Sequence, residues 1–348
     1  MREYHIESLD HGMVEAINHK IDNLNKPKGS LGFLEALARQ TCLIQRTLCP
    51  TLIHPCHLLM GGDHGIERHG VSKSPREVTW QQMINFSKGG GGVNMFCRQH
   101  HFDLRIIDMG VDHDLTACPG ILNHKIDWGT KDFMEGPAMS EAQFEQALAT
   151  GAELVDQCHS EGCNVICIGE MGIANTSPSS IWVSVLCNTP LDICVGAGSG
   201  LDRDGVRRKY ELLKQAQDRF LSVYGKEDKP LLLRYFGGFE MVGAIGAMLR
   251  AAEKRMIILV DGFIMSACML GASALYPQVL DYAVFGHCGS EPGHRLLISH
   301  LGVRPILQLD LCLGEGTGAL CAYPILESAV RMINEMNNFE NANITKYF

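Results

Sequence analysis

Residues 165–168 read Val-Ile-Cys-Ile and run directly into residues 169–172, Gly-Glu-Met-Gly, and this junction decides the fold. A short, uninterrupted apolar run is typical of a strand that is covered on both faces, as parallel strands are. Glycine permits sharp backbone turns and lets a ligand approach the main chain closely. The segment therefore predicts a buried parallel strand that ends in a turn suited to binding.

The same kind of junction recurs along the chain. Apolar runs that lead into a glycine turn also occur at residues 58–60, 104–107, 193–195, 231–233, 257–260 and 283–285. Helical stretches of roughly 10–20 residues fit between most of these runs, as parallel crossover connections require. We therefore predict an α/β fold with a mostly parallel, twisted sheet, flanking helices and glycine turns gathered at the edge where such sheets bind ligands.

Glu315 stands at one of these turns. Residues 313–318 read Leu-Gly-Glu-Gly-Thr-Gly, after residues 305–310, which have strand character, and before a helix predicted over 319–336. The glycines leave this carboxylate little side chain to pack against, so it is either a solvated turn residue or a functional group. The recurrence of the junction favours a functional group.

The two ends of the chain are predicted to be helical. Helices are expected over about 10–24 and 30–48, with Ser30 as a candidate N-cap, and again over the last 30 residues. We predict an α/β catalytic domain over 55–318 and a small helical domain formed by 1–50 together with 319–348. We expect a dimer through this terminal lobe.

Composition limits the possible functions and the location of the protein. A formal charge of −9 argues against binding of nucleic acid or of an anionic membrane. The apolar segment 256–275 is broken by Asp261 and Gly262, which predicts a buried strand, turn and helix and not a membrane span. The 14 cysteines lie mostly in apolar runs and form no CxxC pair, which is typical of free thiols in a reducing cytoplasm.

Two local clusters could suggest a metal site. His64 and His69 are separated by four residues, and residues 112–114 read Asp-His-Asp. Neither cluster matches a familiar ligand spacing, so the sequence predicts no metal and no cofactor.

A set of short motifs occurs in order along about residues 20–335. The motifs are Lys-Pro-Lys-Gly-Ser-Leu-Gly (26–32), Asp-His-Gly (63–65), Glu-Val-Thr-Trp-Gln-Gln-Met (77–83), Gly-Glu-Met-Gly-Ile-Ala-Asn-Thr (169–176), Gly-Gly-Phe-Glu (237–240), Asp-Gly-Phe (261–263), Glu-Pro-Gly-His (291–294) and Gly-Glu-Gly-Thr-Gly (314–318). Each alone is weak, but as an ordered set they are specific. Together they resemble the nicotinate-nucleotide:dimethylbenzimidazole phosphoribosyltransferases of cobamide lower-ligand synthesis.

The resemblance implies a Rossmann-like cytoplasmic enzyme that moves 5-phosphoribose from nicotinate mononucleotide to a flat aromatic acceptor. The acceptor would be 5,6-dimethylbenzimidazole or a phenol, and the products would be nicotinate and an α-ribotide. The alternative is a weakly active or non-catalytic subunit of a heteromeric enzyme that activates phenol or p-cresol, so the assembly would be a homodimer or a heterodimer with a paralogous subunit. A nucleotide-dependent oxidoreductase, suggested by the glycine-rich turn 196–200, is a third interpretation, but the turn lacks the third glycine of the dinucleotide fingerprint.

The resemblance also implies roles for individual residues. Glu315 matches the family's general base and Glu170 a glutamate near the ribose, while Ser74 and Gln82 match residues of the acceptor site. The positions implied for the donor and its phosphate are Gly172, Asn175, Thr176, Gly198, Ser199, Gly200, Lys209, Asp261, Gly289 and Ser290. The paired acids of diphosphate-donor enzymes are absent, so neither magnesium nor phosphoribosyl diphosphate is expected.

Three positions depart from the family pattern. Gly289 stands where serine is usual, Ala197 where arginine is frequent and Ala174 where glycine is usual. The first two lie beside the predicted phosphate site, so the departures leave the partner-subunit interpretation open. Retention of Glu170 and Glu315 favours an active enzyme.

Overall fold

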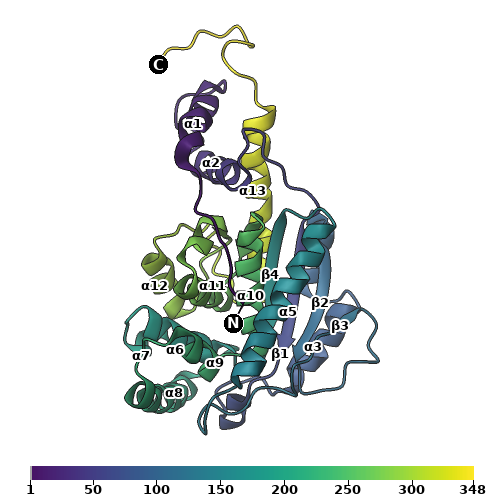
Figure 1. Ribbon diagram of the computed structural model, residues 1–348, viewed down its shortest axis with the longest axis vertical. Helices are drawn as coiled ribbons and strands as arrows, with labels where there is room; N and C mark the ends of the chain where they lie inside the picture. The colour runs from purple at the N-terminus through teal and green to yellow at the C-terminus, as the bar shows by residue number, and fades with distance from the viewer. Residues whose placement is uncertain (1) are drawn as a thin grey trace.

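The computed structural model describes residues 2–348, and over these residues the strands form a six-stranded, entirely parallel sheet in the order β3-β2-β1-β4-β5-β6 (Figure 1). The strands are β1 (Cys56–Gly62), β2 (Asp103–Gly110), β3 (Ile121–Asn123), β4 (Val165–Met171), β5 (Ile257–Val260) and β6 (Ala283–Phe285). The strand order reverses between β1 and β4, which is where open α/β sheets form a crevice at their carboxyl ends. The predicted fold class is confirmed.

Helices cover both faces of the sheet, and some of the helices lie beyond it, at the end of the molecule. They are α1 (Val14–Asn23), α2 (Phe33–Gln45), α3 (Glu77–Ser87), α4 (Gly92–His100), α5 (Glu141–Ser160), α6 (Thr176–Leu186), α7 (Leu191–Cys194), α8 (Arg203–Tyr224), α9 (Lys229–Phe236), α10 (Phe239–Glu253), α11 (Phe263–Leu275), α12 (Pro292–Leu301) and α13 (Thr317–Glu335), with short 3₁₀ turns at His11–Met13, Gly65–His69 and Pro277–Tyr282.

Glycines allow the central helices α5 and α10 to pack closely. A Cβ added at Gly151 of α5 would lie 1.9 Å from the carbonyl oxygen of Gly243, and one added at Gly246 of α10 would lie 2.1 Å from that of Leu148. No side chain fits at such distances, so the two helix backbones are in direct contact. This contact fixes α10 against the sheet, and the start of α10 supplies a buried side chain to the site.

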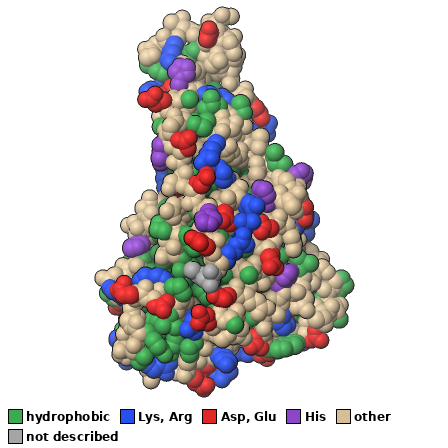
Figure 2. All heavy atoms as spheres, in the orientation of Figure 1, with side chains coloured by type: hydrophobic (Ala, Val, Ile, Leu, Met, Phe, Trp, Pro, Cys, Tyr) green, Lys and Arg blue, Asp and Glu red, His purple; other side chains and the backbone are tan. Residues whose placement is uncertain are grey.

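Helices from the two ends of the chain meet in one lobe, whereas the first described residues lie against the sheet domain, where the amide of His5 donates to Glu253 at 2.8 Å. Helices α1, α2 and α13 gather at one end of the molecule (Figure 1), and Figure 2 shows this end as a narrow extension above a broad base. The backbone amide of Asn25 donates to Asn337 at 2.8 Å, and that of Phe339 donates to Asn23 at 3.1 Å. Helix α13, which contains Pro324, begins at the carboxyl edge of the sheet and ends in the lobe. The division of the chain into two domains stays a prediction.

Two predicted strands were wrong. Residues 231–233 lie in α9, because Asp228 caps that helix by accepting the amide of Leu231 at 2.9 Å and a proline opens its first turn. Residues 193–195 lie in and just after the four-residue helix α7. A short apolar run does not distinguish a strand from a buried helix. Here Pro190 before α7 and the capping residue Asp228 before α9 favour the helix.

Other boundaries also differ from the predictions. Residues 305–310 contribute one isolated bridge, between Leu307 and His287, and Asp310 has a φ of +54°, so this segment is not a strand. The N-cap of α2 is Gly32, with a φ of +52°, and not Ser30, which lies in the preceding turn. The short strand β3 was missed.

The cysteine and membrane predictions can be compared with the structure. All 14 cysteines are free within residues 2–348, as predicted. The apolar segment 256–275 folds as β5, a turn and α11. No helix in the described part of the chain is long and apolar enough to cross a membrane.

Candidate active site

The two predicted catalytic carboxylates lie side by side at the carboxyl edge of the sheet. Glu170 is at the end of β4, and a Cβ added at Gly314 would lie 2.2 Å from its Oε1 atom. A Cβ added at Gly169 would lie 2.4 Å from the backbone carbonyl oxygen of Glu315. The strand end and the turn over 314–316 are therefore in direct backbone contact, which explains why both need glycine.

Glu315 is held in a strained but supported conformation. Its φ is +68°, in the left-handed region that non-glycine residues rarely adopt, and its side chain is 6% exposed. The amide of Val93, in the first turn of α4, donates to Oε2 at 3.3 Å. Burial raises the pKa of Glu315 above its ordinary value, and the Val93 bond opposes this rise. A buried carboxylate with a raised pKa at a fixed position suits proton acceptance.

His57, which the sequence analysis did not identify, packs against the turn over 314–316. His57 lies on β1 and is fully buried, and a Cβ added at Gly316 would lie 2.1 Å from its Cε1 atom. Burial lowers the pKa of His57 to about 3, so the ring is neutral at ordinary pH. A neutral ring can pack under the turn that carries Glu315 without adding a charge there.

Glu170 is protonated near neutral pH in the free protein. Burial raises its pKa to about 8, Asn175 lowers it through a side-chain hydrogen bond, and Glu240, Asp261 and Glu315 raise it further. A cation bound next to this group would lower the pKa and favour the carboxylate. The expectation that Glu170 stabilises positive charge on the ribose therefore requires a bound cationic donor.

Asp261, predicted at the donor site, lies with the acids at the end of β5. Its Oδ1 accepts the amide of Ala319 at 2.9 Å, at the start of α13, and lies 3.6 Å from Nδ1 of His287. Burial raises the pKa of Asp261. Its contacts hold the beginning of α13 next to Glu315.

A buried His64–Glu240 pair lies beside these acids and was also missed. Nε2 of His64 is 2.6 Å from Oε1 of Glu240, and both side chains are almost completely buried. Gly172, a predicted donor position, packs against the pair, since a Cβ there would lie 3.1 Å from Glu240 and 3.2 Å from His64. His64 and Glu240 belong to the motifs at 63–65 and 237–240, but these motifs did not predict a role for either side chain.

Several predicted donor residues form a connected group. Lys209, on α8, is 1% exposed and donates through Nζ to Oγ1 of Thr176 at 2.8 Å and to the carbonyl of Gly196 at 3.4 Å. Burial lowers the pKa of Lys209 to about 8, and nearby Glu291 opposes this shift. Asn175 precedes Thr176 and donates to Glu170, so the chain of contacts runs from the ammonium to the acids.

The glycine-rich turn contacts the predicted acceptor loop. Gly198 and Gly200 have φ values of +54° and +104°, which favour glycine. Between them, Oγ of Ser199 lies 3.0 Å from Oγ of Ser72 and accepts the amide of Ser74 at 3.3 Å. The structure therefore brings donor and acceptor positions together here.

The remaining predicted positions are engaged locally. Oε1 of Gln82, on α3, accepts from the side chain of Asn85 at 3.1 Å. The amide of Gly289 donates to Nδ1 of His294 at 2.9 Å, and the hydroxyl of Ser290 lies 2.9 Å from Sγ of Cys312. The Gly289 amide would reach a ligand only if its bond to His294 opened.

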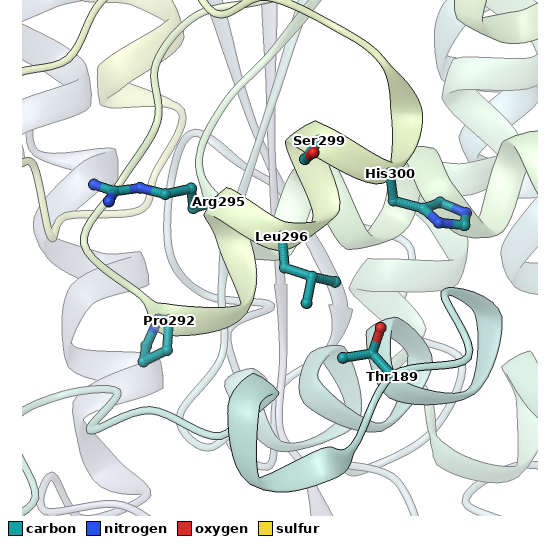
Figure 3. A pocket seen from close by; sticks show the side chains of 6 residues that line it. All are labelled: Thr189, Pro292, Arg295, Leu296, Ser299 and His300. Atoms are coloured by element: carbon teal, nitrogen blue, oxygen red, sulfur yellow. The ribbon is translucent and has the colours of Figure 1, made fainter.

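An open hollow lies away from this chemistry. It has a volume of about 530 Å³ and is lined by Thr189, Pro292, Arg295, Leu296, Ser299 and His300 (Figure 3). None of these residues was predicted for the site. Leu296 points into the space between α12 and Thr189, whereas Arg295 points away from it. The hollow therefore lies between α12 and the segment of Thr189, none of the buried acids lines it, and the carboxyl edge of the sheet remains the candidate site.

Comparisons with known proteins agree with the motifs. A family model described as phosphoribosyltransferase matches residues 6–344. A relative from Phocaeicola vulgatus is 57% identical over 348 residues, and one from Dechloromonas aromatica is 45% identical over 345 residues, with at least 99% of each chain covered. Both are named nicotinate-nucleotide–dimethylbenzimidazole phosphoribosyltransferase. The crystal structure of CobT from Thermus thermophilus superposes with a TM-score of 0.91 at 34% identity, covering 96% of this chain and 99% of that one.

Proposed function

The chain belongs to the nicotinate-nucleotide–dimethylbenzimidazole phosphoribosyltransferase family, and from this premise we propose how its residues carry out the transfer. The enzyme moves 5-phosphoribose from nicotinate mononucleotide to 5,6-dimethylbenzimidazole. The bond from ribose C1′ to the pyridinium nitrogen breaks, and its electron pair leaves with nicotinate. A new bond forms between C1′ and an acceptor nitrogen, and the acceptor loses its N–H proton to give the α-ribotide.

Glu315 takes that proton. The single observation that carries this assignment is the position of Glu315: it is buried at the carboxyl edge, anchored by the Val93 amide and directly beside Glu170. Its raised pKa supports proton acceptance. A positioned general base typically contributes roughly 10²–10⁴ in rate.

Glu170 responds to the charge of the donor. It is mostly protonated in the free protein, and the pyridinium of the bound donor favours its ionised form. The carboxylate then stabilises positive charge that develops on the ribose as the leaving group departs. Its contact with Asn175 connects it to Thr176 and Lys209 at the phosphate end.

The phosphate binds at Lys209 and at backbone amides of 172–176 and 198–200, with Ser290 as a further donor. The Lys209 ammonium is already buried next to Thr176, and a phosphate there would raise its depressed pKa. Ser74 and Gln82 line the acceptor side, which adjoins the Ser199 turn. Asp261 contributes indirectly, through the start of α13.

We also propose a homodimer through the lobe of α1, α2 and α13, and a cytoplasmic location. The 14 free thiols suit a reducing compartment. The names of the relatives give no support to the alternative of a partner subunit in a phenol-activating enzyme.

The test is a reaction of the purified chain with nicotinate mononucleotide and 5,6-dimethylbenzimidazole, followed by chromatography and mass spectrometry. We expect nicotinate and the α-ribotide in equal amounts, and little nicotinate when the acceptor is omitted. Release of nicotinate without ribotide would indicate a hydrolase, and no turnover with this acceptor would refute the function.

A further inference from the structure

Glu291 points into the glycine-rich turn and not toward its own helix. It is the N-cap residue of α12, yet its side chain makes no capping bond there. Instead, Oε1 accepts the backbone amide of Gly198 at 3.0 Å. Within residues 2–348, Oε2 is buried and has no hydrogen-bond partner, and a Cβ added at Gly196 would lie 1.8 Å from it. The carboxylate therefore fills the turn.

The groups around this carboxylate are those that bind anions. Nζ of Lys209 donates to the carbonyl of Gly196 and lies 3.6 Å from the position of a Cβ added at Gly198. Gly198 and Gly200 have positive φ values, and the Gly198 amide is the one that bonds the carboxylate, since the Gly200 amide donates to Ala197. One amide therefore binds the Glu291 carboxylate directly, and a buried ammonium lies against the same turn.

We propose that Glu291 is an internal anion that occupies the phosphate subsite of the free enzyme, and that the donor phosphate displaces its carboxylate to the side of Arg295. The inference rests on the proposed function for the identity of the donor. A carboxylate and a phosphate repel each other at short range, so both cannot occupy the position at the Gly198 amide. The free energy needed to displace the Glu291 carboxylate therefore lowers the affinity of the subsite for phosphate.

Glu291 is consequently a specificity-determining residue. Free inorganic phosphate must displace the carboxylate with no other contact to help it, whereas the complete donor also brings its ribose and pyridinium ring. The internal anion thus excludes small anions from the subsite while the donor still binds.

Arg295 offers a place for the displaced side chain. It lies four residues after Glu291, a spacing that brings side chains together on one helix face. It is exposed, and Figure 3 shows it on the same side of α12 as Pro292, pointing away from the hollow.

The main experiment measures inorganic phosphate binding by calorimetry to the wild type and to Glu291→Gln. Glutamine keeps an oxygen for the Gly198 amide but carries no charge. We expect phosphate affinity to rise by about ten-fold, because the variant removes the charge repulsion and a neutral oxygen competes less strongly for the Gly198 amide than a carboxylate does. Glu153→Gln, which changes an exposed glutamate of α5, is the matched charge control and should behave as the wild type. Unchanged or weaker phosphate binding in Glu291→Gln would overturn the proposal.

A second experiment holds even if Glu291→Gln is unstable. Arg295→Gln alters an exposed side chain and should weaken nicotinate mononucleotide binding about two-fold, because the displaced carboxylate loses its ion pair. Unchanged nicotinate mononucleotide binding in Arg295→Gln would contradict the displacement. Where Glu291→Gln folds, the same change in its background should have no effect. The phosphate titration uses no donor, so failure of the wild type to bind nicotinate mononucleotide would refute the proposed function separately.

Discussion

The acidic end of the site and its phosphate end are built differently. At the acidic end, Glu170 and Glu315 stand on backbones that touch through Gly169 and Gly314, where no further atom fits. At the proposed phosphate end, Ser199 contacts the Ser72 hydroxyl and accepts the Ser74 amide, and the Gly198 amide donates to Glu291. The first arrangement resists movement and the second can exchange partners. The comparison indicates that the positions of the two acids are rigid, whereas the loop around Gly198 and Ser199 can rearrange.

The sharpest test of the fixed end is Glu315→Gln. Glutamine keeps the shape and can accept the Val93 amide but cannot take a proton, so turnover should fall roughly 10²–10⁴-fold. Donor affinity should change little, because the proposed phosphate site, at Lys209 and the turn over 198–200, does not include Glu315. Steady-state kinetics and calorimetry measure the two quantities.

A chemical rescue distinguishes a base from a merely structural residue. Benzimidazoles with a more acidic N–H should recover part of the lost turnover in Glu315→Gln but gain less in the wild type. If turnover of the variant shows no dependence on acceptor acidity, Glu315 is not the base.

The second test concerns the protonation of Glu170. Burial raises the pKa of Glu170 from its ordinary value of 4.5 to about 8, so the stability this group gives is fully present below pH 4.5 and is lost as pH rises through 8. Glu170→Gln does not ionise, so its stability relative to the wild type should grow with pH, by at most about 5 kcal/mol. Urea denaturation of both proteins from pH 5 to pH 9 measures the difference. The other buried acids are present in both proteins, so their contribution cancels in the comparison. A difference in unfolding free energy that does not change with pH would mean that the pKa of Glu170 is not raised.

The third test breaks the backbone contact at the acidic end. Gly169→Ala places a Cβ 2.4 Å from the backbone of Glu315, which should cost about 1–3 kcal/mol of stability and reduce turnover. Gly136→Ala is the matched control, since nothing lies within 4 Å of its added Cβ and its φ is not positive. Thermal melts and kinetics that do not separate the two variants would show that the acidic end is not tightly packed.

The smallest expected effect is at the phosphate end. Ala174 precedes Asn175 with a φ of +78°, a conformation that strains alanine but not glycine. Ala174→Gly should therefore stabilise the protein by about 0.5–1 kcal/mol. Ala149→Gly, in the middle of α5, should instead destabilise it by about 1 kcal/mol. The same sign for both variants in denaturation curves would rule out strain at Ala174.

The sequence was most informative where a local rule governed the structure. The strands β1, β2, β4, β5 and β6 were predicted from an apolar run followed by glycine, because a buried parallel strand needs that pattern. The runs at 193–195 and 231–233 satisfied it too, but prolines and the capping residue Asp228 made those segments helical. β3 has only three residues and a mostly exposed face, so it carried no comparable signal.

Within the candidate site, the placement of Glu170 and Glu315 at the carboxyl edge of the sheet could be predicted because their glycine neighbours and the family motifs are local in sequence. Their partners could not. The Val93 amide and the His57 ring come from elements more than 200 residues away from Glu315. The bond of Glu291 to Gly198 depends on how two loops meet, which no spacing in the sequence records.

Helix α13 gives the molecule a mechanical connection. Its 19 residues span about 28 Å, from the turn of Glu315 to the terminal lobe. A helix of this length moves as a stiff unit. Pro324 removes one backbone hydrogen bond inside α13, so the helix would bend there. A displacement of the lobe would then reach the turn of Glu315 as a small change in the tilt of α13. Hydrogen exchange of the backbone amides should therefore speed up or slow down together at the two ends of α13.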